Sequence, residues 1–233
     1  MCEVYGFCGS KQTLLNKYTD EFWKHSKIHK DGFGYYLADH DELYVNADSA
    51  NSYLIKLAKK KFISDLALCH IRFKTHGAAK IENCHPFVKY DVQGIKWTLI
   101  HNGFIDNNNT LEALATIQSG DTDSERILLF IVEAINSLYE HNWITDVNEL
   151  QYYMYIQIEA AIQSLGTLGK TNLIFTDNYT DNMYVYMNAP NTLFYLNTSD
   201  GVHVATTPLS NEDWKPVTPC KLHIFNNGVK LDY

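Results

Sequence analysis

The spacing of hydrophobic positions changes along the chain and divides it into three stretches. In the first, short apolar runs predict strands, and the turn Asp31-Gly32-Phe33-Gly34 leads into a hairpin. One helical stretch, Leu14 to Lys27, comes before this turn. The strands expected here are residues 4–8, 35–38, 43–45, 64–73 and 95–100. The first half of the chain is therefore expected to be mainly sheet.

A helical period replaces the strand pattern from Asp123 onward. Apolar residues recur every three or four positions as far as Leu138, which is the stripe of an amphipathic helix. Thr122 and Glu125 form a T-x-x-E capping box at its start. A second helix is expected from about residue 148 to 165. The third stretch returns to short strands, at residues 172–176, 183–187, 193–196, 202–205 and 221–225.

The order of these elements favours an α+β fold in which two sheets pack together and helices cover an outer face. No repeat, linker or low-complexity segment interrupts the pattern, so we expect residues 1–233 to form a single domain. The order of elements leaves open which sheet each strand joins.

Composition narrows the classes of function. Lys and Arg total 19 against 27 Asp and Glu, a net charge of −8 that argues against nucleic acid as a ligand. No apolar run reaches the roughly 20 residues of a membrane helix, and the start lacks a secretory signal, so we expect no membrane partner and a cytoplasmic location. The five cysteines are spread without CxxC spacing and are expected to be free thiols.

Cys2 offers a nucleophile and a base on one residue if Met1 is removed. A free thiol has a pKa of about 8.5 and an α-amine one of about 8, so near neutral pH the amine can accept the thiol proton. The alternative is that Cys2 has no catalytic role and is simply the residue that follows the initiator methionine. Candidate site residues elsewhere in the chain must decide between these two interpretations.

Arg72 lies near the end of the strand expected over residues 64–73, in which side chains alternate between faces. His70 and Arg72 share one face, and Cys69 is expected in the core on the other. This alternation disfavours a metal site that uses both Cys69 and His70, and we expect none. The Arg72 guanidinium can bind a substrate carboxylate through two parallel N–H donors. The alternative is that Arg72 forms a structural ion pair within the protein.

The segment His101-Asn102-Gly103 comes directly after an apolar strand. An Asn-Gly pair is first of all a signal for a tight turn. Its side-chain amide and the glycine N–H can also converge on one point, as a tetrahedral oxyanion requires. Asp123 lies in the first turn of the expected helix. Its carboxylate can accept a hydrogen bond from a substrate ammonium group, or it can be there only because the helix dipole stabilises a negative charge at that end.

Six segments stand in a characteristic order and spacing along the chain: Met1-Cys2, His29-Lys30-Asp31-Gly32-Phe33-Gly34, His70-Ile71-Arg72-Phe73-Lys74-Thr75-His76-Gly77, Cys84-His85-Pro86-Phe87, His101-Asn102-Gly103 and Thr122-Asp123-Ser124-Glu125. Taken together, these segments resemble the class II glutamine amidotransferases, with matching order and spacing throughout. A later stretch, residues 205–209 with Trp214, resembles the stand-alone branch of that family.

The resemblance implies an N-terminal-nucleophile hydrolase fold with four αββα layers, two mainly antiparallel sheets and no cofactor. It implies that Cys2 attacks the side-chain amide of glutamine or a γ-glutamyl compound, with Asn102 and Gly103 holding the oxyanion. Arg72 would bind the α-carboxylate and Asp123 the α-ammonium. The pocket would be shaped by Thr75, His76 and His85.

Two residues differ from many relatives, because Phe33 and Phe73 stand where tryptophan is common. The chain also has no room for the second domain that consumes ammonia in synthases of this kind, so a separate ammonia-accepting synthase is a possible partner. The alternatives are another N-terminal-cysteine hydrolase, such as the penicillin-acylase or bile-salt-hydrolase branch, and a non-catalytic ligand-binding or regulatory subunit.

Overall fold

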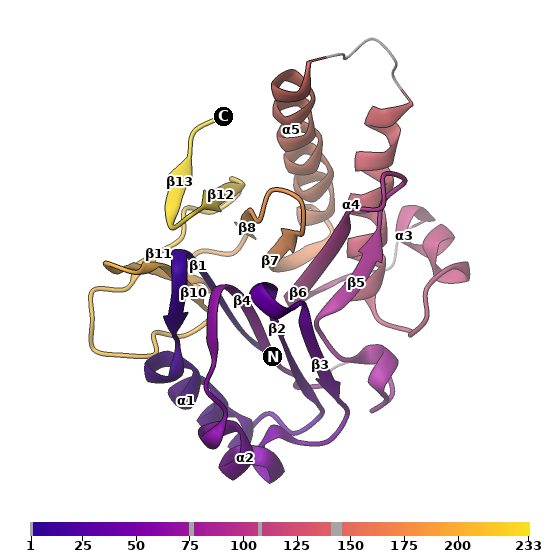
Figure 1. Ribbon diagram of the computed structural model, residues 1–233. Coiled ribbons are helices and arrows are strands. Elements are labelled where there is room, and N and C mark those ends of the chain that lie inside the picture. Colours follow the sequence, from indigo (N-terminus) through magenta and orange to yellow (C-terminus); the bar gives the residue numbers. More distant parts are fainter. Residues whose placement is uncertain (1, 75–76, 107–108, 141–145) are drawn as a thin grey trace.

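Two sheets lie face to face and helices cover their outer sides, which gives four layers (Figure 1). The structure is a computed structural model that describes residues 2–74, 77–106, 109–140 and 146–233. Neighbouring strands in both sheets run antiparallel. The four-layer αββα fold expected from the resemblance is therefore confirmed.

Seven strands form the first sheet, in the order β11-β9-β10-β1-β4-β2-β3. Strand β1 lies at its centre, so the start of the chain is held between β4 and β10. The bounds are β1 Glu3–Leu14, β2 Phe33–Leu37, β3 Glu42–Asn46, β4 Ile63–Ile71, β9 Phe194–Asn197, β10 Gly201–Ala205 and β11 Lys215–Pro216.

Six strands form the second sheet, in the order β13-β12-β8-β7-β6-β5. Its longest pairing joins β6 to β7. The bounds are β5 Phe87–Tyr90, β6 Lys96–Ile105, β7 Gly169–Asp177, β8 Met183–Met187, β12 His223–Asn226 and β13 Val229–Leu231.

The helices divide between the two outer faces. Helices α1 (Asn16–Lys24) and α2 (Leu54–Lys59) contribute to an apolar cluster on the first sheet, and α4 (Asp123–Tyr139) and α5 (Val147–Gly166) to one on the second. Helix α3 (Asn109–Ala113) and single helical turns at residues 25–27, 38–40, 50–53, 81–83 and 114–116 complete the described elements. Both long helices were predicted within a residue or two at each end, α4 from its hydrophobic period.

A third apolar cluster fills the space between the sheets. Alternate residues of β1 and β4 face it, including Val4, Cys8 and Leu68, whereas Tyr5 and Cys69 face the helices. Cys69 is fully buried in the outer cluster, as the alternation predicted. The five cysteines are free, as expected from their spacing.

Two local predictions were only partly right. The segment from His101 to Gly103 forms no turn, because β6 continues through it to Ile105 and pairs with β7. At the start of α4, Thr122 accepts a hydrogen bond from the Glu125 N–H. The Glu125 carboxylate accepts instead from the N–H groups of Ser119 and Gly120, so the reciprocal half of the capping box is replaced by a loop contact.

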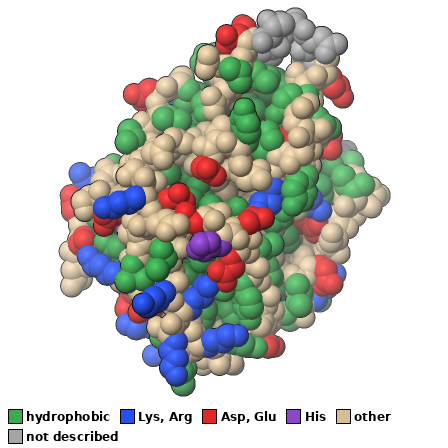
Figure 2. All heavy atoms as spheres, viewed as in Figure 1, with side chains coloured by type: hydrophobic (Ala, Val, Ile, Leu, Met, Phe, Trp, Pro, Cys, Tyr) green, Lys and Arg blue, Asp and Glu red, His purple; other side chains and the backbone are tan. Residues whose placement is uncertain are grey.

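Charged side chains of both signs are interspersed over the face in Figure 2, with Lys and Arg more frequent toward the end of the molecule that carries α1 and α2.

Among the described residues, no helix is both long and apolar enough to span a bilayer.

Candidate functional site

Cys2 lies at the end of the central strand of the first sheet. Glu3 pairs with Ile71 and Val4 with His70, so one step further along the ladder Cys2 is opposite Arg72. Its sulfur contacts the backbone of the next residue, with Sγ 3.4 Å from the Phe73 nitrogen and 3.6 Å from the Phe73 oxygen. By alternation along β1, the Cys2 side chain belongs to the face turned toward the second sheet.

Burial raises the pKa of the Cys2 thiol above its ordinary value. The hydrogen bond from Phe73 and the positive charge of Arg72 act against burial, and the negative charge of Asp123 adds to it. The thiol is therefore mostly protonated near neutral pH and needs a base before it can attack. The charges of Arg72 and Asp123 therefore both act on the sulfur, in opposite directions.

Arg72 is 3% exposed and is fixed through backbone and side chain. Its N–H donates to the Gly32 oxygen at 2.8 Å, and its oxygen accepts from the Asp31 N–H at 3.1 Å. The guanidinium Nη1 donates to the Ala78 oxygen at 3.1 Å and approaches the Asp31 oxygen at 3.4 Å. Both of these acceptors are uncharged carbonyl oxygens, so the two contacts leave the positive charge of the guanidinium in place.

Asn102 and Gly103 enter the site from the second sheet. They pair with Asn172 and Thr171 of β7, and alternation turns the Asn102 side chain toward the first sheet. Asn102 is buried, and its Oδ1 has no hydrogen-bond partner among the described residues. The position of Gly103 excludes a larger residue, because a Cβ there would overlap the Lys170 carbonyl oxygen of β7.

Asp123 is the first residue of α4 and is partly exposed. Its Oδ2 accepts from the Ile105 N–H at 2.9 Å, and its Oδ1 from the Ser124 N–H at 2.9 Å. These bonds fix the carboxylate between the end of β6 and the start of α4. Each carboxylate oxygen can accept more than one hydrogen bond, so the group can still receive an ammonium.

Three buried histidines lie next to these groups. The His70 and His85 rings contact each other with centroids 3.9 Å apart, and His70 Nε2 lies 3.2 Å from the His101 carbonyl oxygen. His101 Nδ1 forms a hydrogen bond of 2.9 Å with Ser124 Oγ. Burial lowers the pKa of His70 to about 3 and that of His85 well below its ordinary value. The His70 and His85 rings are therefore neutral at physiological pH.

Of the residues selected from the sequence, Arg72 lies opposite Cys2 along the ladder, and the charges of Arg72 and Asp123 both affect the pKa of the Cys2 thiol. His85 follows Cys84, whose thiol pKa is affected by both Cys2 and Arg72. Asn102 approaches from the opposite sheet, next to the carbonyl that His70 contacts. Thr75 and His76 lie outside the described residues, so their predicted places stay predictions.

Two contacts of the site were not anticipated from the sequence. The Phe73 backbone holds the Cys2 sulfur, and the Ser124 hydroxyl links α4 to His101. The alternation that put Arg72 and Phe73 on opposite faces gave no indication of a backbone contact. Among the described residues, no group of three or more His, Cys, Asp or Glu side chains could hold a metal ion.

Chemically, the site combines a half-buried thiol with a cation, Arg72, and an anion, Asp123, whose charges both act on that thiol, and with the Asn102 amide on the facing sheet. A cation and an anion held apart on rigid elements can bind the two charged groups of an amino acid. The thiol can attack an electrophilic carbon held between them.

Comparison with known proteins gives the same family as the sequence motifs. The family model described as glutamine amidotransferases class-II matches residues 1–200. A Haemophilus influenzae protein provisionally named a glutamine amidotransferase is 26% identical, with 99% of this chain and 86% of the relative aligned.

Solved structures share the fold. A protein described as a predicted glutamine amidotransferase from Pseudomonas aeruginosa superimposes with a TM-score of 0.67 at 17% identity, covering 100% of both chains. The glutamine phosphoribosylpyrophosphate amidotransferase from B. subtilis gives a TM-score of 0.69 at 19% identity, covering 99% of this chain and 48% of that one.

Proposed function

Because the chain belongs to the class II glutamine amidotransferases, we propose that it is a stand-alone amidase that uses Cys2 to hydrolyse the side-chain amide of glutamine or a γ-glutamyl compound. The mature chain begins at Cys2 after removal of Met1. Residues 1–233 form one amidotransferase domain, since strands from both ends of the sequence join the same two sheets.

The reaction begins with transfer of the thiol proton to the α-amine of Cys2. This base is needed because burial raises the pKa of the thiol. The sulfur forms a bond to the amide carbon, and the carbonyl π electrons move to oxygen. The tetrahedral oxyanion is held by the Asn102 side-chain N–H and the Gly103 backbone N–H, which together stabilise the developing charge.

Collapse of the intermediate breaks the carbon–nitrogen bond. The Cys2 ammonium returns its proton to the leaving nitrogen, so that ammonia departs and a thioester remains. Water then attacks the thioester with the same amine as base, and glutamate is released with the thiol restored. One residue supplies both nucleophile and base, so no separate catalytic histidine is required.

Substrate binding depends on the charges that flank the sulfur. Arg72 binds the α-carboxylate and Asp123 the α-ammonium, while Thr75, His76 and the neutral ring of His85 shape the pocket. An amino acid held at its two charged groups presents its side chain at a fixed distance from them.

The observation that carries the proposal is the place of the Cys2 sulfur. The sulfur contacts the backbone of Phe73, the residue after Arg72, and the charges of Arg72 and Asp123 both affect the pKa of the thiol. Ammonia released here would pass to a separate acceptor, and an ammonia-accepting synthase is the partner we propose.

Replacing Cys2 by alanine tests the function directly. The mature wild type should release ammonia and glutamate from glutamine, and intact mass should show loss of one methionine. The Cys2→Ala variant should release neither while keeping its circular dichroism spectrum. Equal turnover in the variant would reject the proposal, and glutamine binding without ammonia release by the mature wild type would indicate a non-catalytic subunit.

A further inference from the structure

Glu3, the residue after the nucleophile, is contacted by groups from two separate parts of the chain, residues 25–29 and residues 206–207. Its side chain is 16% exposed and turns to the face opposite Cys2. Thr206 Oγ1 donates to Glu3 Oε2, and the Thr207 hydroxyl lies 3.4 Å from the same oxygen. His25 Nδ1 is 3.7 Å from Oε2, and His29 Nε2 is 3.8 Å from Oε1.

The residues after β10, here called the strap (residues 206–214), extend the contact between β10 and β1. Val4 N–H donates to Thr206 Oγ1 at 3.2 Å, and Thr206 N–H donates to the Val4 oxygen at 3.2 Å. Further along, Leu209 is buried in the cluster beneath α1. The strap is therefore fixed to the first residues of β1 through both backbone and side chain.

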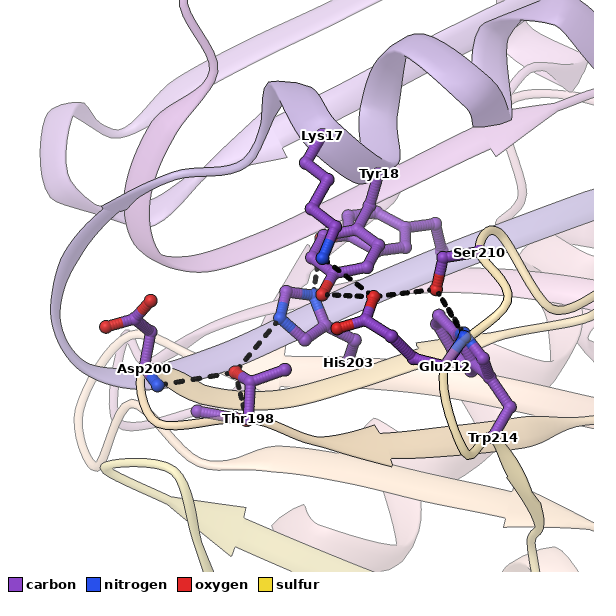
Figure 3. Close-up of polar contacts among 10 residues, drawn as sticks. Lys17, Tyr18, Thr198, Asp200, His203, Ser210, Glu212 and Trp214 are labelled. Atoms are coloured by element: carbon purple, nitrogen blue, oxygen red, sulfur yellow. Dashed lines mark hydrogen bonds and ion pairs between the residues drawn. The ribbon is translucent and has the colours of Figure 1, made fainter.

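The far end of the strap is fastened to α1 (Figure 3). Glu212 Oε2 accepts from the Tyr18 hydroxyl at 3.0 Å and lies 2.8 Å from Lys17 Nζ. Ser210 Oγ lies 2.8 Å from the same carboxylate oxygen and accepts from Trp214 Nε1 at 3.0 Å. Because both ends are anchored, Thr206 and Thr207 have a fixed position relative to the start of the chain.

A second connection leads from Glu3 back to the sulfur. The His29 ring meets the Phe73 ring edge to face, with centroids 5.6 Å apart, and the Phe73 backbone contacts Cys2 Sγ. Burial acts to raise the pKa of the Glu3 carboxyl, but the hydrogen bond from Thr206 and the nearby His25 ring outweigh it and lower the pKa. Glu3 is thus a carboxylate at neutral pH.

A chain terminus is tethered on one side only and tends to be poorly ordered unless it is tied down. The proposed chemistry places thiol and base on that terminal residue, and its orientation must be held within a fraction of an ångström. Resting on that proposed function, we propose that Glu3 is a positioning residue for Cys2, and that Thr206 and Thr207 of the strap hold its carboxylate.

The test compares Glu3→Ala, Glu3→Gln and Thr206→Val with wild type. Each protein is released from an N-terminal fusion so that Cys2 is its first residue, which intact mass verifies. Glu3→Ala should lower kcat for glutamine about tenfold to a hundredfold while KM changes less than about threefold. Glu3→Gln keeps an acceptor for Thr206 and should recover part of kcat, and Thr206→Val should lower kcat in the same direction.

Thr198→Val is the matched control. Thr198 lies in the turn between β9 and β10, where its hydroxyl contacts the Gly201 oxygen and His203 (Figure 3). It should leave kcat within about twofold of wild type. Loss of folded protein with unchanged kcat per folded molecule in Glu3→Ala and Thr206→Val would overturn the positioning role.

Alkylation separates this inference from the proposed function. The rate at which iodoacetamide modifies Cys2, located by peptide mass, should fall at least about threefold in Glu3→Ala even if glutamine is not the substrate. No ammonia release from glutamine by any form, with alkylation still dependent on Glu3, would reject the substrate but support positioning. Equal alkylation rates in wild type, Glu3→Ala and Thr206→Val would reject the role of Glu3 in positioning Cys2.

Discussion

The sulfur of Cys2 lies 3.4 Å from the backbone nitrogen and 3.6 Å from the backbone oxygen of Phe73. Phe73 follows Arg72 directly in the sequence. The segment Arg72–Phe73 therefore positions both the guanidinium and the Cys2 sulfur. The Phe73 backbone makes this contact with the sulfur, while the Phe73 ring contacts the ring of His29.

An uncleaved N-terminal extension should remove activity, because it converts the α-amine of Cys2 into a peptide nitrogen that cannot accept a proton. General-base catalysis typically contributes about 10²- to 10⁴-fold, so turnover of glutamine should fall by at least about a hundredfold. Ammonia release measures the effect. Proteolytic removal of the extension should restore the rate, and full activity with the extension still present would show that the amine is not the base.

Asn102→Ala should lower kcat by about 10²- to 10³-fold with little change in KM, because its amide is proposed to act on the oxyanion rather than on bound glutamine. Steady-state kinetics measure both constants. A rise in KM at constant kcat would instead assign Asn102 to ground-state binding.

Arg72→Lys should weaken glutamine binding and raise KM about tenfold or more, since a lysine cannot donate to a carboxylate with two parallel N–H groups. Lys74→Ala is a matched control, because the Lys74 side chain is exposed nearby. Isothermal titration of the inactive Cys2→Ala form measures affinity without turnover. Equal affinity in wild-type and Arg72→Lys backgrounds would contradict the role of Arg72.

Gly103→Ala should destabilise the fold by about 2 kcal/mol or more, because its Cβ would overlap the Lys170 carbonyl and lie 2.6 Å from His101 Nε2. Gly94→Ala is the comparison, since the structure places no described atom within 4 Å of a Cβ there. Its φ of +80° still costs about 1 kcal/mol for alanine. Urea unfolding of both variants should show the larger loss at Gly103.

Stability should fall as the pH drops from about 6.5 toward 4, because burial lowers the pKa of His70 to about 3 and of His203 to about 4. In that window the unfolded chain binds more protons than the folded one, so acid favours unfolding by about 1.4 kcal/mol per pH unit for each such histidine. His203→Asn should reduce the slope of unfolding free energy against pH. An unchanged slope would show that His203 is protonated in the folded protein.

Much of the secondary structure followed from the spacing of apolar residues. Helices α4 and α5 begin and end close to their predicted positions, and Thr122 caps α4 as its T-x-x-E pattern predicted. The outcome at Asn102-Gly103 was different, because nine residue pairs between β6 and β7 outweigh the local preference of this dipeptide for a turn. Pairing with a distant strand is not encoded in the two residues themselves.

The site shows the same division between local and long-range information. Alternation along the strand was enough to separate His70 from Cys69. The contact of Glu3 with Thr206 joins residues 203 positions apart. Nothing in either residue's neighbourhood in the sequence predicts it, because it exists only once β10 has paired with β1.

By itself, the sequence determined the periods of the elements, the faces of the strands, and the family through residues in a fixed order. Only the tertiary structure decided which strands share a sheet, what supports the Cys2 sulfur and what holds Glu3. Periodicity depends on backbone geometry within a few residues, whereas contacts across the fold depend on how the whole chain closes its loops and buries its apolar surface.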